Sequence, residues 1–241
     1  MLEPIVQDQA YHRFADARGL LGIANAADTL SNVALILVGA AALLFLWRER
    51  RARERSVARE EMRPYWVLFA AVAGTAAGSV YYHLAPDDSR LVWDRLPMAV
   101  GFMAFVCAVI GERVSVRVAD ALLIPLASLG MASVALWAVS GDLRPYLLTQ
   151  FGSIAAVVLV AALYRSRYSG GGIVFVAVAL YALAKFAESY DRPLFELTRH
   201  AMSGHTLKHL LAAAALWVIY RSLARRAARK TSPPLTSAAC R

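Results

Sequence analysis

Apolar residues gather into seven blocks along the chain, separated by polar connections. The blocks are about 16 to 22 residues long, close to the ~20 that a helix needs to cross a hydrocarbon core about 30 Å thick. Every backbone amide in lipid needs an internal partner, and the blocks lack the alternation of barrel strands, so we expect helices. The predicted spans are residues 30–47, 65–84, 91–110, 118–139, 146–164, 173–190 and 205–223.

Composition agrees with a membrane protein. Hydrophobic residues fill 59% of the 241 positions, above the roughly 45 to 50% of an average soluble domain. The predicted fold is an all-α, polytopic bundle of seven transmembrane helices formed by residues 28–223. Residues 1–27 form an extracytoplasmic segment without the basic and apolar regions of a signal peptide. Residues 224–241 form a basic cytosolic tail that we expect to be disordered.

Basic residues divide unevenly between the two sets of connections. The net charge of +9 would also suit a nucleic-acid partner, but sixteen Lys and Arg residues fall on one side of the predicted bundle and six on the other. Cytoplasmic loops carry the excess of basic residues, so we expect the N-terminus outside, the C-terminus in the cytosol and no nucleic-acid partner. The sixteen are Arg48, Arg50, Arg51, Arg53, Arg55, Arg59, Arg63, Arg113, Arg117, Arg165, Arg167, Arg221, Arg225, Arg226, Arg229 and Lys230; the six are Arg13, Arg18, Arg90, Arg144, Arg192 and Arg199.

A few ionisable residues lie within the spans, where each costs several kcal/mol and indicates function. His83 ends the second span, Asp94 opens the third, and His205 and His209 open the seventh, all toward the predicted outer face. Ser79 and His83 are four residues apart, as are His205 and His209, so each pair shares a helix face. The short loop 85–90 brings Asp94 back near His83.

Three imidazoles with an open fourth position suit a catalytic zinc ion, and a nearby carboxylate can take the proton of its water ligand. The alternative is that these histidines are interfacial residues that cap helix ends.

Three segments carry a family resemblance: Gly-Ser-Val-Tyr-Tyr-His-Leu at residues 78–84, Trp-Asp-Arg-Leu-Pro-Met at residues 93–98, and Ser-Gly-His-Thr-Leu-Lys-His-Leu at residues 203–210. They resemble the alkaline ceramidase (alkaline phytoceramidase) family, part of a seven-helix hydrolase superfamily that includes the adiponectin and progestin receptors. The shared pattern is Ser-x-x-x-His near the end of helix two, Asp at the start of helix three and His-x-x-x-His in helix seven.

The resemblance implies a zinc-dependent hydrolysis of ceramide to a sphingoid base and a fatty acid. It implies that His83, His205 and His209 bind zinc and that Asp94 orients and deprotonates the zinc-bound water. Ser79 would hydrogen-bond the substrate carbonyl or the oxyanion formed from it.

Eukaryotic members of that family also bind calcium through an acidic N-terminal segment. This chain offers Asp16, Asn25 and Asp28 there, together with Asp8 and the pair Ser31–Asn32. Oxygen ligands suit calcium, although the segment is shorter and less acidic than the family pattern. An N-cap role for Asp28 at the first helix is an alternative reading.

The favoured function is a zinc-dependent membrane amidase acting on a lipid amide, either ceramide or another N-acyl lipid. The Ala- and Arg-rich loops are typical of a bacterial protein, so we expect an inner-membrane location with the site near the periplasmic face. The alternatives are a receptor-like protein with a structural or slowly hydrolytic zinc site, and a haem or metal-transport protein.

Several neighbouring residues receive structural interpretations. We expect Lys208 to point to a different helix face from the histidines, and Lys185, Glu188 and Asp191 to form a solvated helix end rather than an ion-pair network. Tyr81, Tyr82 and Trp93 fit an interfacial aromatic belt.

Overall fold

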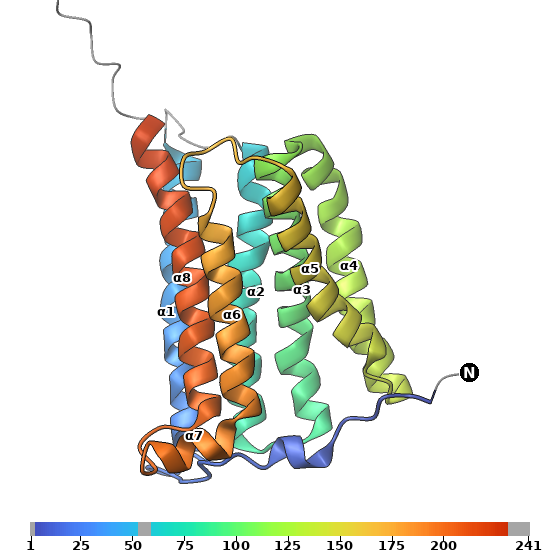
Figure 1. The fold of residues 1–241 in the computed structure, drawn as a ribbon, viewed down its shortest axis with the longest axis vertical. Coiled ribbons are helices and arrows are strands. Elements are labelled where there is room, and N and C mark those ends of the chain that lie inside the picture. The colour runs from blue at the N-terminus through green and yellow to red at the C-terminus, as the bar shows by residue number, and fades with distance from the viewer. Residues whose placement is uncertain (1–2, 53–58, 231–241) are drawn as a thin grey trace, which may run out of the picture.

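The computed structural model describes residues 3–52 and 59–230, and within them the regular elements are helices (Figure 1). This confirms the all-α prediction. The elements in chain order are η1 (Gln9–His12), α1 (Ala26–Arg51), α2 (Arg59–Leu84), α3 (Asp88–Arg113), α4 (Val116–Ser140), α5 (Arg144–Leu163), α6 (Ile173–Ser189), α7 (Asp191–Leu197) and α8 (Gly204–Lys230).

Six of these helices are long and apolar enough to cross a membrane: α1, α2, α3, α4, α5 and α8. The pair α6 and α7 passes the same test only together, and it is bent by 84° at the break between them. The protein is therefore a multi-pass membrane protein with six spans, or seven if the bent pair counts as one.

The predicted sixth span ends close to where α6 ends, and Pro193 explains the break. A proline has no N–H to donate to the carbonyl four residues before it and its ring clashes with that carbonyl, which here belongs to Ser189. The chain therefore turns after Ser189 and starts α7 in a new direction. The last helix is longer than predicted, because α8 continues to Lys230, beyond the predicted end of the span at Leu223. Residues 231–241 of the predicted tail lie outside the described residues.

One end of the bundle carries α7 and the N-terminal segment, residues 3–25, and we call it the α7 end (Figure 1). The first residues of α1, α3, α5 and α8 and the last residues of α2, α4 and α6 lie at this end. Helix α1 packs against both α2 and α8, and α8 also packs against α6. The second and last predicted spans therefore lie in the same part of the bundle.

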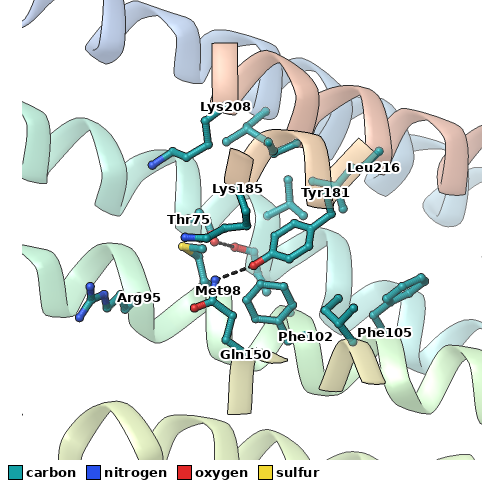
Figure 2. Close-up of a pocket in the computed structure, with 18 of the residues that line it drawn as sticks. Thr75, Arg95, Met98, Phe102, Phe105, Gln150, Tyr181, Lys185, Lys208 and Leu216 are labelled. Carbon is teal, nitrogen blue, oxygen red and sulfur yellow. Dashed lines mark hydrogen bonds between the residues drawn. The ribbon is translucent and has the colours of Figure 1, made fainter. Parts of the chain in front are cut away.

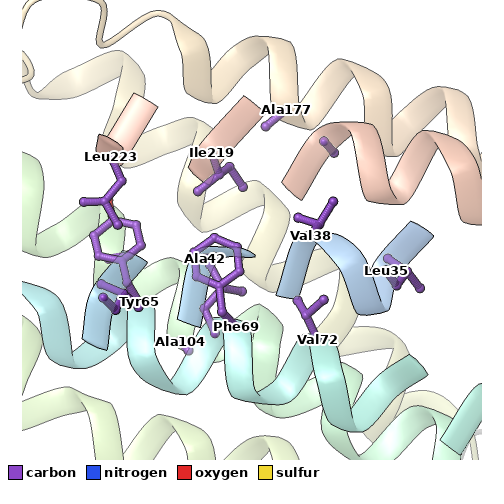
Figure 3. Close-up of a cluster of buried hydrophobic side chains, with 14 of the residues drawn as sticks. Leu35, Val38, Ala42, Tyr65, Phe69, Val72, Ala104, Ala177, Ile219 and Leu223 are labelled. Atoms are coloured by element: carbon purple, nitrogen blue, oxygen red, sulfur yellow. The ribbon is translucent and has the colours of Figure 1, made fainter. Parts of the chain in front are cut away.

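The packed centre of the bundle is formed mainly by residues of α1, α2, α3 and α8, with single residues from α4 and α6 (Figure 3). Ala42, Phe69 and Leu223 are almost fully buried there. In a membrane, association of helices depends on close van der Waals contact, because lipid tails are as apolar as the side chains. This core therefore holds the histidine-bearing helices α2 and α8 in fixed register.

The N-terminal segment crosses the α7 end and is tied to several loops. The Ile5 amide donates to Asp142 Oδ1 at 3.2 Å, and the Ala15 amide donates to Asp191 Oδ2 at 2.8 Å. Arg144 hydrogen-bonds Asp142 and lowers the pKa of that carboxyl to about 2, so it stays an acceptor. The segment therefore closes this end of the bundle.

Helices α2 and α3 approach most closely at Gly78. A Cβ atom built there would lie 2.0 Å from the carbonyl oxygen of Trp93 and 3.0 Å from the amide nitrogen of Asp94. Only glycine leaves room for the α3 backbone at this point. The contact brings the start of α3 against the end of α2, one residue from Ser79.

Gly78→Ala should therefore destabilise the protein, because its methyl group would meet backbone atoms that cannot rotate away. We expect a loss of about 1 to 3 kcal/mol or more, measured by thermal unfolding in detergent. Gly152→Ala is the matched control, since nothing lies within 4 Å of its added Cβ and alanine favours helix. Equal unfolding midpoints for the two variants would contradict this account of the contact.

Candidate metal centre

Three histidine side chains meet at the α7 end of the bundle. His83 comes from α2, and His205 and His209 come from α8; one ring nitrogen of each lies within 4.8 Å of the others. The ring centroids are 4.8 to 5.1 Å apart. All three side chains are buried. The sequence spacing alone did not place the last span beside the second, so the structure supplies this juxtaposition.

The start of α8 is fixed by local polar contacts. Ser203 Oγ accepts a hydrogen bond from the Thr206 amide as an N-cap, and Asp191 Oδ1 accepts one from the His205 amide at 2.8 Å. A Cβ on Gly204 would lie 2.1 Å from the carbonyl oxygen of Ala187. This close approach of α8 to α6 sets where His205 enters the bundle.

Neighbouring groups orient the imidazoles. Ser31 Oγ lies 2.7 Å from His209 Nδ1, which leaves Nε2 of that ring toward the cluster as a ligand atom. His83 Nδ1 is buried and has no hydrogen-bond partner among the described residues. The Phe14 ring covers the cluster, with its centroid 4.7 Å from that of His83 and 4.6 Å from that of His205.

The donor set fits a metal ion. Buried polar atoms are normally hydrogen-bonded, so the unpartnered nitrogen of His83 in a cluster of imidazoles needs an explanation. A metal ion held at about 2.0 to 2.1 Å from each nitrogen would satisfy it with small side-chain movements. The three histidines could therefore hold one metal ion, with a further coordination position left for water or substrate.

Ser79 and Asp94 lie beside this cluster. Both are buried, and both line the same cavity. Asp94 does not cap α3, because Asp87 is the N-cap and accepts from the Arg90 amide. It also forms no ion pair with Arg95 among the described residues. Among the described residues, Asp94 therefore serves neither as a helix cap nor as the ion-pair partner of Arg95.

A cavity of ≈ 320 Å³ adjoins the cluster, and Ser79, Asp94 and His209 line it. It runs between α2, α3, α5, α6 and α8. Figure 2 shows the basic side chains of Arg95, Lys185 and Lys208 toward one end and Phe105 and Leu216 toward the other. One hydrogen bond, from Gln150 Nε2 to Tyr181 Oη, crosses its middle. The cavity is thus polar near the histidines and mostly apolar further into the bundle.

Lys208 does not point away from the histidines, contrary to the sequence-based expectation. Its Nζ atom lies 2.9 Å from His205 Nε2 and donates to Glu188 Oε1 at 2.9 Å. Lys185 pairs with the other oxygen of Glu188. Lys185 and Glu188 therefore form a partly buried ion-pair network and not the expected solvated helix end. The contact of Lys208 with His205 follows from helix geometry, because residues three apart are neighbours on a helix surface.

Tyr11 completes this network from the N-terminal segment. Its hydroxyl donates to Glu188 Oε1 at 2.9 Å, and burial raises the pKa of that hydroxyl well above its ordinary value, so it stays a donor. No sequence signal predicts this contact, because the two residues are far apart in the chain and Tyr11 lies outside every apolar block.

Two of the three residues predicted for an interfacial aromatic belt are exposed and one is buried. Tyr81 is 49% exposed and Trp93 is 59% exposed, but Tyr82 is 1% exposed and its hydroxyl lies 2.8 Å from His12 Nδ1. Tyr82 belongs to the packing under the N-terminal segment. Through this contact, His12 links the N-terminal segment to α2.

The residues predicted for calcium have other partners. Both oxygens of Asp16 accept from the Arg18 side chain at 2.7 Å, and these hydrogen bonds lower the pKa of the Asp16 carboxyl below its ordinary value. Asn25 donates its side-chain amide to the His83 carbonyl at 2.7 Å. The calcium site stays a prediction, but these two side chains already serve to hold the N-terminal segment and α2 in place.

Asp28 lies in the first turn of α1 and does not cap it, since α1 begins at Ala26 with Asn25 as N-cap. Its Oδ1 accepts instead from the hydroxyls of Ser203 and Thr206, at 3.1 and 2.6 Å. The N-cap reading is therefore corrected: Asp28 fastens α1 to the start of α8.

A family described as "Family of unknown function (DUF6962)" matches residues 27–228. The chain belongs to this family. The matched range runs from the start of α1 to the last turns of α8, so it includes Ser79, Asp94 and the three histidines. A search of curated proteins found no match to this chain. The family match covers the helical bundle, and the family's description names no activity.

Purified protein should bind about one divalent metal ion per chain, measured by elemental analysis in detergent. His83→Ala, His205→Ala and His209→Ala should each lose most of it, because the remaining two imidazoles form a much weaker site. His200→Ala is the matched control, since its ring packs on Phe195 away from the cluster. Full metal retention in the triple variant would contradict the site.

Proposed function

We propose that the protein is a zinc-dependent membrane hydrolase that cleaves the amide bond of a lipid. The observation that carries this proposal is that Ser79, Asp94 and His209 line one cavity whose other walls are mostly apolar. The resemblance to the alkaline ceramidase family at these positions supports the same reading. Ceramide or another N-acyl lipid would fit the proposal.

The side chains of this cavity can divide the reaction between them. A bound zinc ion would act as a Lewis acid and lower the pKa of a water ligand to about 7. Asp94 accepts a proton from the attacking water, and Ser79 donates a hydrogen bond to the carbonyl oxygen as negative charge develops there. The water oxygen bonds to the carbonyl carbon, the C–N bond breaks and the leaving nitrogen takes up the proton. The products are a fatty acid and an amine.

The shape of the cavity supports a lipid substrate. Its deeper walls include Phe105 and Leu216, which suit an alkyl chain, while the polar groups stand at the α7 end. Phe151 also lines it and is 50% exposed on the outside of α5. A lipid could therefore enter from the bilayer beside α5, with its amide near the metal and its chain in the apolar part.

Lys208 would change partner when a metal ion binds. Its ammonium lies 2.9 Å from His205 Nε2, where it competes with a cation for the same lone pair. Metal binding through that nitrogen would leave Lys208 with Glu188, to which it is already bonded. Glu188 therefore keeps this charge compensated in either arrangement.

Asp94→Asn should keep the metal and the fold while amide hydrolysis falls by roughly 10² to 10⁴, the usual contribution of a positioned general base. Ser79→Ala should lose roughly 10² to 10³ if its hydroxyl serves the oxyanion. The measurement is fatty-acid release from a panel of N-acyl lipids by protein of equal metal content.

Asp88→Asn is the matched control for Asp94, because it removes a carboxylate from the same helix. Asp88 is bonded to Gln9 and His12 and lies outside the cavity. Wild-type turnover in a folded, metal-loaded Asp94→Asn protein would rule out the proposed general base.

We also propose that the α7 end faces the periplasm and that the protein lies in a bacterial inner membrane. The sixteen-to-six division of basic residues supports this orientation by the positive-inside rule. Reporter fusions after Arg63, Arg167 and Arg229 should read cytosolic, and fusions after Arg90 and Arg199 should read external. An external reading at the C-terminal fusion would reverse the assignment.

A further inference from the structure

Arg95 is a buried cation at the α7 end of the cavity, and the residues that the structure describes offer it no counter-ion. The residue is 7% exposed and lines the cavity. One of its terminal nitrogens, Nη2, donates to Gln7 Oε1 at 2.7 Å. The other, Nη1, is buried without a hydrogen-bond partner, and no carboxylate of the described residues lies within ion-pair distance of the guanidinium.

Aromatic rings hold the guanidinium in place. Its central carbon lies 4.4 Å from the ring centroid of Trp137, 4.8 Å from that of Tyr146 and 5.5 Å from that of Tyr11. Cation–π contacts favour the charge, but they leave the in-plane donors of the guanidinium free. The rings therefore orient Arg95 without satisfying its hydrogen-bonding capacity.

The buried arginines Arg113 and Arg226, unlike Arg95, each lie within ion-pair distance of a carboxylate. Arg113 donates to backbone carbonyls of Ala161, Tyr164 and Gly171 and lies 3.7 Å from Glu112. Arg226 pairs with Glu112. Because an uncompensated buried charge is costly, the exception at Arg95 indicates a missing anionic partner.

The charges that line the cavity also indicate a missing anionic partner. Its cations are Arg95, Lys185 and Lys208, and its anions are Asp94 and Glu188. Glu188 is occupied by both lysines. Asp94 affects Arg95 only at longer range. The cavity therefore has a surplus positive charge, and Arg95 is the cation left without a carboxylate.

We propose that Arg95 binds a carboxylate or phosphate of the lipid that occupies the cavity. The in-plane donors of an arginine match these groups better than a neutral headgroup. This inference rests on the proposed function and narrows it, because the substrate becomes an N-acyl lipid with an anionic group at the polar end. The same chemistry is offered by two sources, the headgroup of the substrate or the carboxylate of the fatty acid it releases.

The test is equilibrium binding to the full chain in a neutral detergent, with EDTA present so that no metal ion contributes to anion binding or hydrolysis. Three probes share one acyl chain: N-palmitoylglycine, its neutral counterpart N-palmitoylethanolamine, and palmitate. The fluorescence of Trp137, which contacts the guanidinium, offers a readout alongside equilibrium dialysis.

The wild-type protein should prefer an anionic probe over the neutral one by roughly 10- to 100-fold, the range for a hydrogen bond to a charged group. Arg95→Gln should abolish this preference and leave the affinity for N-palmitoylethanolamine within about twofold. Arg95→Lys should retain part of it. Arg90→Gln, which removes an equal charge from α3 outside the cavity, should retain all of it.

The two probes with a carboxylate separate the two sources. An Arg95-dependent preference for N-palmitoylglycine assigns the anion to the headgroup, and one confined to palmitate assigns it to the product. If Arg95→Gln weakens all three probes equally, Arg95 only anchors Gln7 and Tyr11, and the inference is overturned. Because no hydrolysis is measured, the outcome does not depend on whether the zinc chemistry is correct.

Discussion

The arrangement of this protein depends on one constraint: a polar group within a membrane-spanning bundle must find its partner inside the protein. Along most of their length the helices meet this by being apolar. At the α7 end they carry histidines, carboxylates and lysines, and the chain surrounds these groups with others that bond to them. Asp28 holds the hydroxyls of Ser203 and Thr206, and Asp191 holds the amides of Ala15 and His205. Six buried side-chain atoms of the described residues have no hydrogen-bond partner, and two of them, His83 Nδ1 and Arg95 Nη1, adjoin the candidate site.

Close backbone contact makes this polar cluster possible. Gly78 lets the start of α3 lie against α2, and Gly204 lets the start of α8 lie against α6. These two approaches help to bring side chains from three helices together, because Ser79 and His83 follow Gly78 on α2, His205 and His209 follow Gly204 on α8, and the Asp94 backbone lies against Gly78. Small residues at such crossings are the usual means by which membrane helices pack. Here they also decide the geometry of the site.

The sequence predicted what depends on local pattern and missed what depends on distant contacts. Apolar blocks predicted the helices with ends within four residues, except that α2 begins six residues earlier and α8 ends seven residues later than predicted. The spacing of His205 and His209 placed both on one face of the last helix. The approach of His83 to them could not be derived, because it depends on how α1, α2 and α8 pack. The prediction for Lys208 was wrong because a residue three positions after His205 is its neighbour on the helix surface. The prediction for Tyr82 was wrong because an aromatic residue near a helix end can face inward as well as outward. Asp16 stays a predicted calcium ligand, and its hydrogen-bond partner Arg18 lies only two residues away in the chain.

The N-terminal segment contributes side chains to the candidate site. Phe14 lies over two of the histidines, Tyr11 bonds to Glu188, and Gln7 bonds to Arg95. Glu188 in turn holds Lys208, which contacts His205. A displacement of this segment would therefore uncover the histidine cluster and break the hydrogen bonds of Gln7 with Arg95 and of Tyr11 with Glu188. Access to the histidines and the charge of the adjoining cavity are thus linked through one stretch of chain, since Phe14 covers the histidines and Gln7 and Tyr11 bond to charged residues that line the cavity.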